Sequence, residues 1–264
     1  MELVCPICGD TLEQEEQVWC CQKRHSFDIA RQGYVNLLPV QQKHSLQPGD
    51  TKEQVRARRE FLDGGFYAPI AHTLCDMAAG CTGPILDVGC GEGYYSAALA
   101  QTLGTELVGL DISKEAVRYA AGRYKNSLWL CSTAAKLPVK DQSIGLLTSL
   151  FALTVPEEFR RVLRPDGAFI QVLAAEDHLL GLKSVIYPEL THKEKNSVPA
   201  FHGFRLEESR KLRFTFTVEG EQVQNLLSMT PHVYRISREG VRRLQQTQTL
   251  TDTASCVLNM YRPV

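Results

Sequence analysis

Short apolar runs alternate with helical segments between residues 84 and 172, and this alternation constrains the fold more than any other feature of the chain. We expect strands over 85–88, 106–110, 128–131, 144–150 and 168–172. The helices among them are expected over 95–103, 113–121 and 157–163. Such a repeat is typical of a parallel sheet with helices on both faces. Two further strand-like runs, 212–218 and 254–261, follow near the end of the chain.

A glycine-rich loop follows the first of these strands and precedes a helix. It reads Asp87-Val88-Gly89-Cys90-Gly91-Glu92-Gly93. Glycines let a backbone turn tightly and approach a ligand closely. Asp111 ends the second strand, where a carboxylate accepts hydrogen bonds from the ribose hydroxyls of a nucleoside cofactor. The loop and Asp111 together predict a nucleoside-binding site at the carboxyl ends of the strands.

The alternative for this loop is a dinucleotide-binding domain of the NAD type. That site would require the spacing G-x-G-x-x-G and a helix N-terminus open to a diphosphate. Here the acidic Glu92 stands where the diphosphate would dock. An acid at this point suits a cationic or zwitterionic ligand better. S-adenosylmethionine (SAM), with its sulfonium and amino-acid tail, fits that description.

Two short hooks of soft ligands stand at the start of the chain, Cys5-x-x-Cys8 and Cys21-x-x-x-His25. Thiolates and imidazole form the tetrahedral shell that Zn²⁺ prefers. The spacing predicts a zinc module over residues 1–35, with Cys20 as an alternative to Cys21. A redox C-x-x-C beside an unrelated Cys/His pair is the other interpretation. So short a segment needs the metal for folding energy.

Composition places the chain among soluble globular proteins. It has 264 residues, a formal net charge of −1 and no apolar run of eighteen residues, so we expect no membrane span. The start of the chain lacks the basic and apolar regions of a signal peptide. Nine cysteines in such a chain suggest the reducing cytoplasm. We expect a zinc module over 1–35, a linker with a basic helix over 36–66, and a catalytic domain over 67–264.

Several segments resemble class I SAM-dependent methyltransferases. Residues 85–95 resemble their first motif, and Gly109-Leu110-Asp111-Ile112-Ser113 resembles their second. Residues 137–141 and Arg164-Pro165-Asp166-Gly167 resemble two later turns. The resemblance implies a Rossmann-like, mostly parallel seven-stranded sheet.

A narrower resemblance covers nearly the whole chain. The two zinc hooks, Gly33 to Val40, Pro48-Gly49-Asp50, Ala57-Arg58-Arg59 and Met229-Thr230-Pro231 are similar to the bacterial 23S rRNA guanine-N1 methyltransferases. That family methylates N1 of a guanine in an rRNA hairpin loop and uses its zinc module for RNA recognition. The resemblance implies SAM and Zn²⁺ as cofactors and 23S rRNA as partner; a homodimer is a further expectation. One departure is Phe151-Ala152-Leu153-Thr154, where the relatives carry Tyr-Ala-Pro-Cys.

Candidate site residues follow from these motifs. The expected cofactor-binding residues are Tyr67, Asp87, Gly89, Gly91, Gly93, Tyr95, Ser96, Asp111, Thr133 and Ala134. The family resemblance adds three catalytic candidates, His178, Lys183 and Tyr187. A helix would bring Lys183 and Tyr187 to one face. For each ring and each charged residue, packing or solvation is the alternative role.

A basic stretch lies between the two predicted modules. It contains Lys43, His44, Lys52, Arg56, Arg58 and Arg59. Local positive charge of this kind can contact RNA phosphates although the whole chain is nearly neutral. The rival functions are a methyltransferase for tRNA or a small molecule, and a non-catalytic SAM-binding RNA adaptor. The zinc module argues against the first, and the altered 151–154 segment permits the second.

Overall fold

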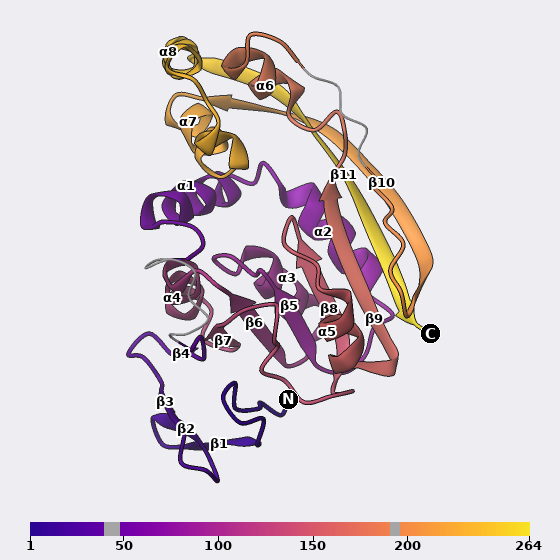
Figure 1. Ribbon diagram of the computed structural model, residues 1–264. Helices are drawn as coiled ribbons and strands as arrows, with labels where there is room; N and C mark the ends of the chain where they lie inside the picture. Colours follow the sequence, from indigo (N-terminus) through magenta and orange to yellow (C-terminus); the bar gives the residue numbers. More distant parts are fainter. Residues whose placement is uncertain (40–47, 191–195) are drawn as a thin grey trace.

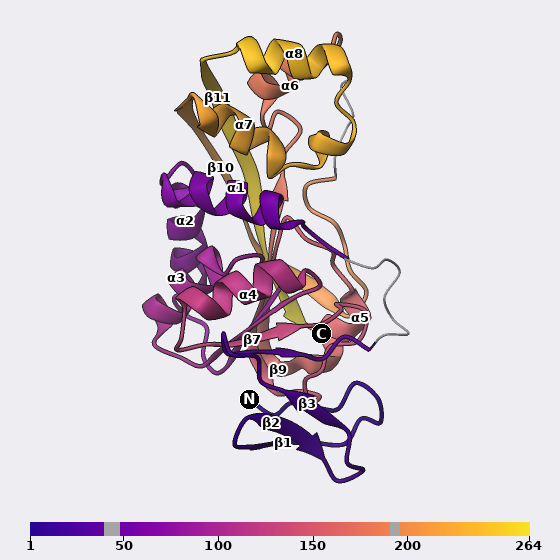
Figure 2. The ribbon, with the colours of Figure 1, turned by 90° about the vertical axis from the view of Figure 1, so that its left-hand side faces the viewer.

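The computed structural model describes residues 1–39, 48–190 and 196–264. An eight-stranded sheet forms its centre, with a small zinc module at one end (Figure 1). At the other end lies a helical lobe, made of the helical segments 180–186, 221–228, 231–234 and 238–246. The two views, related by a quarter turn, agree on this arrangement (Figure 2). Lys43 and His44 of the basic stretch lie outside the described residues. None of the helices in these ranges is long and apolar enough to cross a membrane.

The sheet has the strand order β10-β11-β9-β8-β5-β6-β7-β4. Its parallel part consists of β4 (Tyr34–Asn36), β5 (Ile85–Val88), β6 (Leu107–Asp111), β7 (Leu128–Cys131), β8 (Ile144–Leu150) and β9 (Leu163–Ala174). Two long antiparallel strands complete it, β10 (Phe204–Glu219) and β11 (Thr249–Pro263). The expectation of seven strands is corrected to eight, because β4 pairs with β7. This strand also crosses the boundary expected after residue 35.

Local sequence explains where the helices begin. In α1 (Lys52–Asp63) Thr51 and Gln54 form a capping box, and Ser113 caps α4 (Lys114–Arg123). Proline stands in the first turn of α2 (Ala68–Ala78) and of α5 (Pro156–Val162). The other helices are α3 (Tyr94–Leu103), α6 (Leu180–Ile186), α7 (Glu221–Ser228), the 3₁₀ turn η2 (Pro231–Tyr234) and α8 (Arg238–Gln246).

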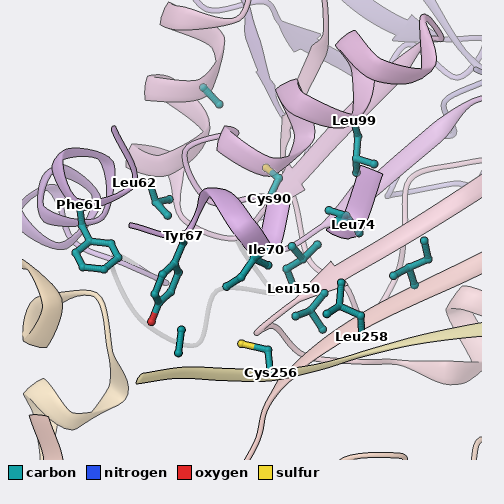
Figure 3. Close-up of a cluster of buried hydrophobic side chains, with 14 of the residues drawn as sticks. Phe61, Leu62, Tyr67, Ile70, Leu74, Cys90, Leu99, Leu150, Cys256 and Leu258 are labelled. Carbon is teal, nitrogen blue, oxygen red and sulfur yellow. The ribbon is translucent and has the colours of Figure 1, made fainter. Parts of the chain in front are cut away.

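The sheet separates two hydrophobic cores. On one face, strand residues such as Ile85 and Trp129 pack with α2, α3 and α4. Figure 3 shows part of this core, including Phe61 of α1 beside Tyr67. On the other face, residues such as Leu86 and Phe169 pack with α5 and with the zinc module. The module is therefore anchored to the sheet by shared apolar burial.

The zinc module itself is a small antiparallel sheet of β1 (Leu12–Glu15), β2 (Val18–Cys21) and β3 (Ser26–Asp28). Its first residues bridge to the catalytic domain, since the Val4 amide donates to the Pro138 carbonyl at 3.0 Å. Lys136 donates to the Pro6 carbonyl at 2.9 Å. These bonds and the shared core hold the module against the face of the sheet that α5 covers.

Candidate functional site

A cavity of about 1400 Å³ opens at the carboxyl ends of the parallel strands, beneath the helical lobe. This is the edge at which open α/β sheets bind ligands. Eleven of the thirteen predicted cofactor and catalytic residues line it: Tyr67, Asp87, Gly89, Gly91, Tyr95, Asp111, Thr133, Ala134, His178, Lys183 and Tyr187. Gly93 and Ser96 do not. The folded chain thus brings together residues separated by up to 120 positions in the sequence.

The glycine loop is held by Asp111 at the end of β6. One carboxylate oxygen accepts from the Gly91 amide at 2.9 Å, and the other accepts from the Ser113 amide at 2.8 Å. Burial raises the pKa of Asp111, while the two amides and the nearby Arg58 act to lower it. Each oxygen has a second lone pair for a ligand. Asp111 therefore fixes the loop and presents a carboxylate to the cavity.

Gly89 is required by both backbone conformation and space. Its φ is +81°, and a Cβ there would lie 2.4 Å from the Cβ of Ala152. The loop after β5 is consequently in close contact with the segment after β8. This contact connects the expected cofactor site with the 151–154 segment, whose sequence departs from that of the relatives.

Asp87 lies beneath the loop in a polar cluster inside the sheet. It accepts hydrogen bonds from the hydroxyls of Ser96 and Thr148. Burial raises the pKa of Asp87 to about 6. Ser96 itself does not line the cavity, but its hydroxyl holds Asp87, which does. Gly93 has a packing role, since its φ is +89° and a Cβ would lie 2.7 Å from the Trp129 ring.

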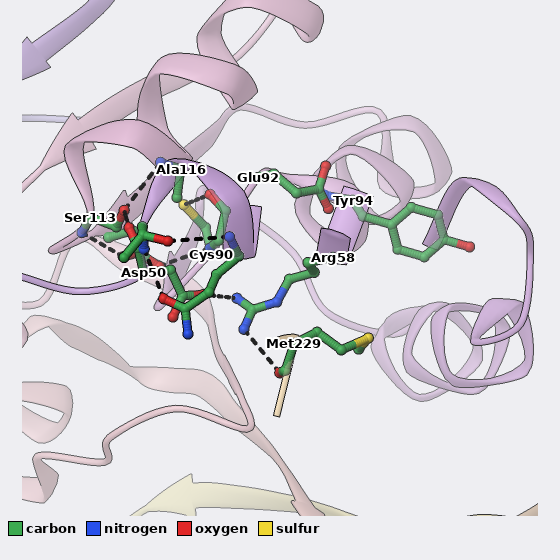
Figure 4. Close-up of polar contacts among 12 residues, drawn as sticks. Asp50, Arg58, Cys90, Glu92, Tyr94, Ser113, Ala116 and Met229 are labelled. Carbon is green, nitrogen blue, oxygen red and sulfur yellow. Dashed lines mark hydrogen bonds and ion pairs between the residues drawn. The ribbon is translucent and has the colours of Figure 1, made fainter. Parts of the chain in front are cut away.

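Arg58 closes one side of the cavity. Its guanidinium lies 2.8 Å from the Asp50 carboxylate and donates to the Met229 carbonyl at 3.4 Å, as Figure 4 shows. Asp50 in turn accepts at its backbone carbonyl from the Ser113 hydroxyl at 2.7 Å. Arg58 therefore joins the 48–50 segment, α1 and the helical lobe across the cofactor loop.

The other two arginines of α1 do not share this position. Arg56 and Arg59 are absent from the cavity lining. Arg59 lies over the ring of Tyr119 at 5.2 Å, and Arg56 lies 3.8 Å from Glu60. The helix packs against α7 in the lobe, at the far end of the molecule from the zinc module (Figure 1). Arg59 instead lines a second pocket together with Gln32 of the 1–35 segment and Glu92. The expectation that all three arginines share one RNA-binding cleft with the zinc module stays a prediction.

Glu92 is a buried carboxyl group at the start of α3. It accepts from the Tyr94 amide at 3.3 Å. Burial raises its pKa to about 7, although this amide, Arg123 and Arg58 act to lower it. The side chain reaches the cavity wall. The structure thus places the Glu92 carboxyl group at the N-terminus of α3, where a dinucleotide-binding site would need to accept a diphosphate.

Aromatic groups form the far wall of the cavity. Phe151 has a φ of +53°, which is rare for a residue with a Cβ, and its side chain is 43% exposed. Its ring lies 6.1 Å from that of His178. His178 Nδ1 lies 3.0 Å from the Ser255 carbonyl oxygen, and Nε2 lies 3.4 Å from the Tyr67 hydroxyl. The side chain of Leu153 beside them is 70% exposed.

The helix predicted to carry Lys183 and Tyr187 exists as α6. Tyr187 is its C-cap, with its amide donating to the Lys183 carbonyl at 2.9 Å. The Tyr187 hydroxyl lies 2.8 Å from Nδ1 of His232. His232 was not among the predicted site residues, although the Met229-Thr230-Pro231 motif directly precedes it. That motif was the signal that could have identified this wall of the cavity.

The four predicted metal ligands converge at the zinc module. Their ligand atoms all lie within 4.8 Å of one another. The Cys8 and Cys21 sulfurs are 3.7 Å apart, and His25 Nδ1 lies 3.5 Å from Cys5 and 3.4 Å from Cys21. A tetrahedral zinc with bonds of about 2.3 Å to sulfur needs sulfurs about 3.8 Å apart. The group is a Cys₃His zinc site with the spacing that Zn²⁺ requires.

Cys20 does not belong to this site. It precedes Cys21 on β2, and successive side chains of a strand point to opposite faces. Its Cα partner across the ladder is Glu13. The sequence had left Cys20 and Cys21 open as alternatives, and the fold decides for Cys21.

Comparison with known proteins matches both parts of the chain. The zinc-ribbon family described as "RlmA, N-terminal" matches residues 3–46. A relative from Micromonospora griseorubida, named as a proposed 23S rRNA (guanine-N(1)-)-methyltransferase, is 34% identical over 99% of this chain and 97% of its own length. This chain belongs to the RlmA family. The 23S rRNA (guanine(748)-N(1))-methyltransferase of Streptomyces fradiae is 31% identical over 99% of this chain and 97% of its own length.

The catalytic part of this RlmA family member matches a wider group. A family described as "Methyltransferase domain" covers residues 85–167. A solved structure of a proposed type II methyltransferase from Anaeromyxobacter dehalogenans superimposes with a TM-score of 0.52 at 17% identity, covering 83% of this chain and 98% of the other. At that identity the likeness concerns the fold alone. The chain is thus a class I SAM-dependent methyltransferase with an N-terminal zinc ribbon.

Proposed function

We propose that this RlmA family member transfers a methyl group from SAM to N1 of a guanine in a hairpin loop of 23S rRNA. One observation carries the proposal: relatives named for this reaction match the chain from end to end, zinc ribbon and catalytic domain together. The cavity at the strand ends supports it, since it combines a nucleoside-type carboxylate with an exposed aromatic wall. SAM supplies the electrophilic methyl group.

The cofactor would lie over the glycine loop. We assign the ribose hydroxyls to Asp111, whose oxygens keep free lone pairs beside Gly91. Gly89 and Gly91 leave room for close approach, and Thr133 and Ala134 line the neighbouring wall. Tyr67 and Tyr95 would cover the methionine part. Asp87, Ser96 and Gly93 would act from behind, by holding the loop and its helix in position.

The target base would enter between Phe151 and His178. Phe151 offers an exposed ring on which an extruded purine can stack. N1 of neutral guanine carries a proton, so transfer needs a base. We assign that role to His178. With its proton on Nδ1, donated to the Ser255 carbonyl at 3.0 Å, the imidazole would carry its lone pair on Nε2, which lies 3.4 Å from the Tyr67 hydroxyl. Lys183 and Tyr187 are the candidates for holding O6.

The zinc ribbon would recognise RNA outside the target base. We retain this role as a proposal, together with a cytoplasmic location, which is favoured by nine cysteines of which none forms a disulfide. The homodimer expected from the sequence also stays a proposal. It can be tested by measuring the mass in solution by light scattering at several protein concentrations. A mass equal to that of one 29.5 kDa chain at all concentrations would reject the dimer.

One experiment separates the proposed reaction from its rivals. The purified enzyme is incubated with tritiated SAM and either unmodified 23S rRNA or bulk tRNA, and the product is mapped by primer extension, which stops at N1-methylguanine. We expect label only in 23S rRNA, with a single stop in a hairpin loop. Label in tRNA alone would mean that tRNA, and not 23S rRNA, is the substrate. Binding of SAM and RNA without any transfer would make the chain an adaptor.

A further inference from the structure

The helical lobe carries an exposed surface formed by Tyr234, Arg235, Arg238 and Arg242, which we call the C-terminal basic surface. It extends from the end of η2 along α8, at the opposite end of the molecule from the zinc module (Figures 1 and 2). Tyr234 is 71% exposed, the most of any large hydrophobic side chain described. All three arginines are exposed as well.

The charges of this surface are largely uncompensated. Among the described residues no carboxylate lies within 4 Å of Arg235 or Arg238. Arg242 lies 3.8 Å from Glu239, and both of these side chains are more than 60% exposed. An exposed ion pair of this kind contributes little to stability, so Arg242 can give up Glu239 for another anionic partner. Arg238 and Arg242 are one turn apart on α8, so they share a side of the helix.

A neighbouring arginine shows what a structural role looks like in this lobe. Arg243 points inward and donates to the carbonyls of Val185 at 2.7 Å and Ile186 at 3.2 Å, which ties α8 to α6. Within residues 1–39, 48–190 and 196–264, the side chains of the three arginines of the C-terminal basic surface make no such bonds. Packing of the lobe therefore does not account for them.

Tyr234 is held in place although its ring is exposed. Its hydroxyl donates to Gln54 Oε1 at 3.0 Å and accepts from Gln54 Nε2 at 2.8 Å. Gln54 is itself fixed by the capping box of α1. A ring held by its hydroxyl loses little freedom when a flat partner stacks on it. The arrangement offers an aromatic platform flanked by guanidinium groups.

This surface continues into the cavity. Arg235 lines the cavity wall, together with Pro231 and His232 of η2. Tyr234 lies between those residues along the chain. The surface is therefore within reach of a polymer whose base is inserted beside Phe151 in the same cavity.

We propose that the C-terminal basic surface binds the single-stranded RNA that flanks the target guanine. Stacking on an aromatic ring and charge contact with phosphates are the two terms that hold single-stranded nucleic acid. The chain carries a net charge of −1, so attraction to RNA has to come from local groups such as these. The proposal rests on the proposed rRNA methylation and adds a second RNA contact, remote from the zinc ribbon.

The test compares matched variants that change the charge equally. Arg235→Gln/Arg238→Gln removes two charges from the surface, and Arg205→Gln/Lys211→Gln removes two exposed charges from β10 that lie outside the cavity lining. Binding of a 23S rRNA fragment is measured by fluorescence anisotropy between 50 and 200 mM salt. We expect the first variant to bind about 10- to 30-fold more weakly at 100 mM and to lower the salt slope by about 1.4. The β10 variant should match the wild type in both respects.

A second pair of variants tests the aromatic platform. Tyr234→Ala should weaken RNA binding about tenfold, since it removes a stacking ring. Tyr234→Phe keeps the ring but loses the bond to Gln54, and should stay within about threefold of the wild type. Equal losses for Ala and Phe would mean that the tyrosine only braces the lobe. SAM affinity, measured by calorimetry, should be unchanged in Tyr234→Ala, Tyr234→Phe and the β10 variant, none of which changes a residue of the cavity lining.

The outcomes separate the two proposals. If the wild type methylates 23S rRNA and the Arg235/Arg238 variant binds RNA like the β10 variant, the surface is not an RNA contact and this inference is overturned. If the wild type itself transfers no methyl group to 23S rRNA, the proposed function is what fails. Weaker binding with a reduced salt slope, confined to the Arg235/Arg238 variant, supports the inference.

Discussion

Replacing Asp111 by alanine should weaken SAM binding strongly while leaving the fold intact. The carboxylate stands at the end of β6 and lines the cavity. If it accepts hydrogen bonds from the ribose hydroxyls, its removal deletes charge-assisted bonds. Bonds to charged groups contribute about 1.5–3 kcal/mol. We therefore expect the Kd for SAM to rise roughly 10- to 150-fold.

The stability of the variant needs separate treatment, because Asp111 also serves the apo-protein. Its loss leaves the Gly91 and Ser113 amides without their acceptor, at a cost of about 1–3 kcal/mol each. Removing the side chain also ends the burial of a charge, whose cost is visible in the raised pKa. The two effects oppose each other, so the net loss should be smaller than the sum over the amides.

Calorimetric titration with SAM gives the affinity, and thermal unfolding without ligand gives the stability. Asp111→Asn is the matched control, since it keeps the size and one acceptor oxygen but loses the charge, and its SAM affinity should fall between those of the wild type and Asp111→Ala. An unchanged Kd in a folded Asp111→Ala protein would refute the assignment of Asp111 to the cofactor. Equal affinities for Ala and Asn would show that charge, and not the number of acceptors, decides binding.

The remaining predictions concern the zinc site, the buried acid, the base and the glycine loop. Removal of zinc by a chelator should release about one equivalent of metal and lower the midpoint of thermal unfolding of the whole protein, because the ribbon shares a core with the sheet; an unchanged midpoint would mean that the ribbon adds nothing to the fold. Burial raises the folded-state pKa of Glu92 to about 7, above its unfolded value of about 4.3, so its contribution is fully present below pH 4 and is lost as pH rises through 7. The free energy of unfolding should therefore fall by up to about 4 kcal/mol over that window through this group, and denaturant titrations of Glu92→Gln should lack that fall. His178→Ala should lower kcat by about 10²- to 10⁴-fold with an unchanged Kd for SAM; single-turnover assays that detect no loss would exclude His178 as the base. Gly89→Ala should destabilise the protein because its Cβ would meet Ala152 at 2.4 Å, and adding Ala152→Gly should recover only part of the loss, since the left-handed backbone stays strained; full recovery in urea unfolding would attribute the whole effect to the contact.

Local signals in the sequence were sufficient to predict most of the helices and central strands. The strand predicted over 128–131 is β7 with the same bounds, and the helix predicted over 113–121 is α4, with Ser113 as its N-cap. These features depend on neighbours within a few residues, through side-chain caps and short apolar runs. The zinc ligands and the glycine loop were readable for the same reason, because each motif is a short string whose chemistry needs a given spacing.

Structural features that depend on partners far away in the sequence could not be predicted from local sequence patterns. Strand β4 has only three residues and exists because it pairs with β7, almost a hundred positions away. Strand β10 was expected over 212–218 but begins at Phe204, since its charged outer positions hide the pattern until it pairs with β11. The zinc ribbon was expected to be a separate module and instead completes one of the two cores.

The chain by itself thus determined which chemistry is present: a soft-ligand metal site, a loop for a nucleoside cofactor and a carboxylate beside it. Only the tertiary structure decided which side chains share the cavity. His178 meets Tyr67 across 111 positions, while Arg56 and Arg59, close to Arg58 in sequence, do not line the cavity. Sequence motifs record local conformation and ligand type, whereas convergence depends on how the sheet, the lobe and α1 pack, and that packing is a property of the whole chain.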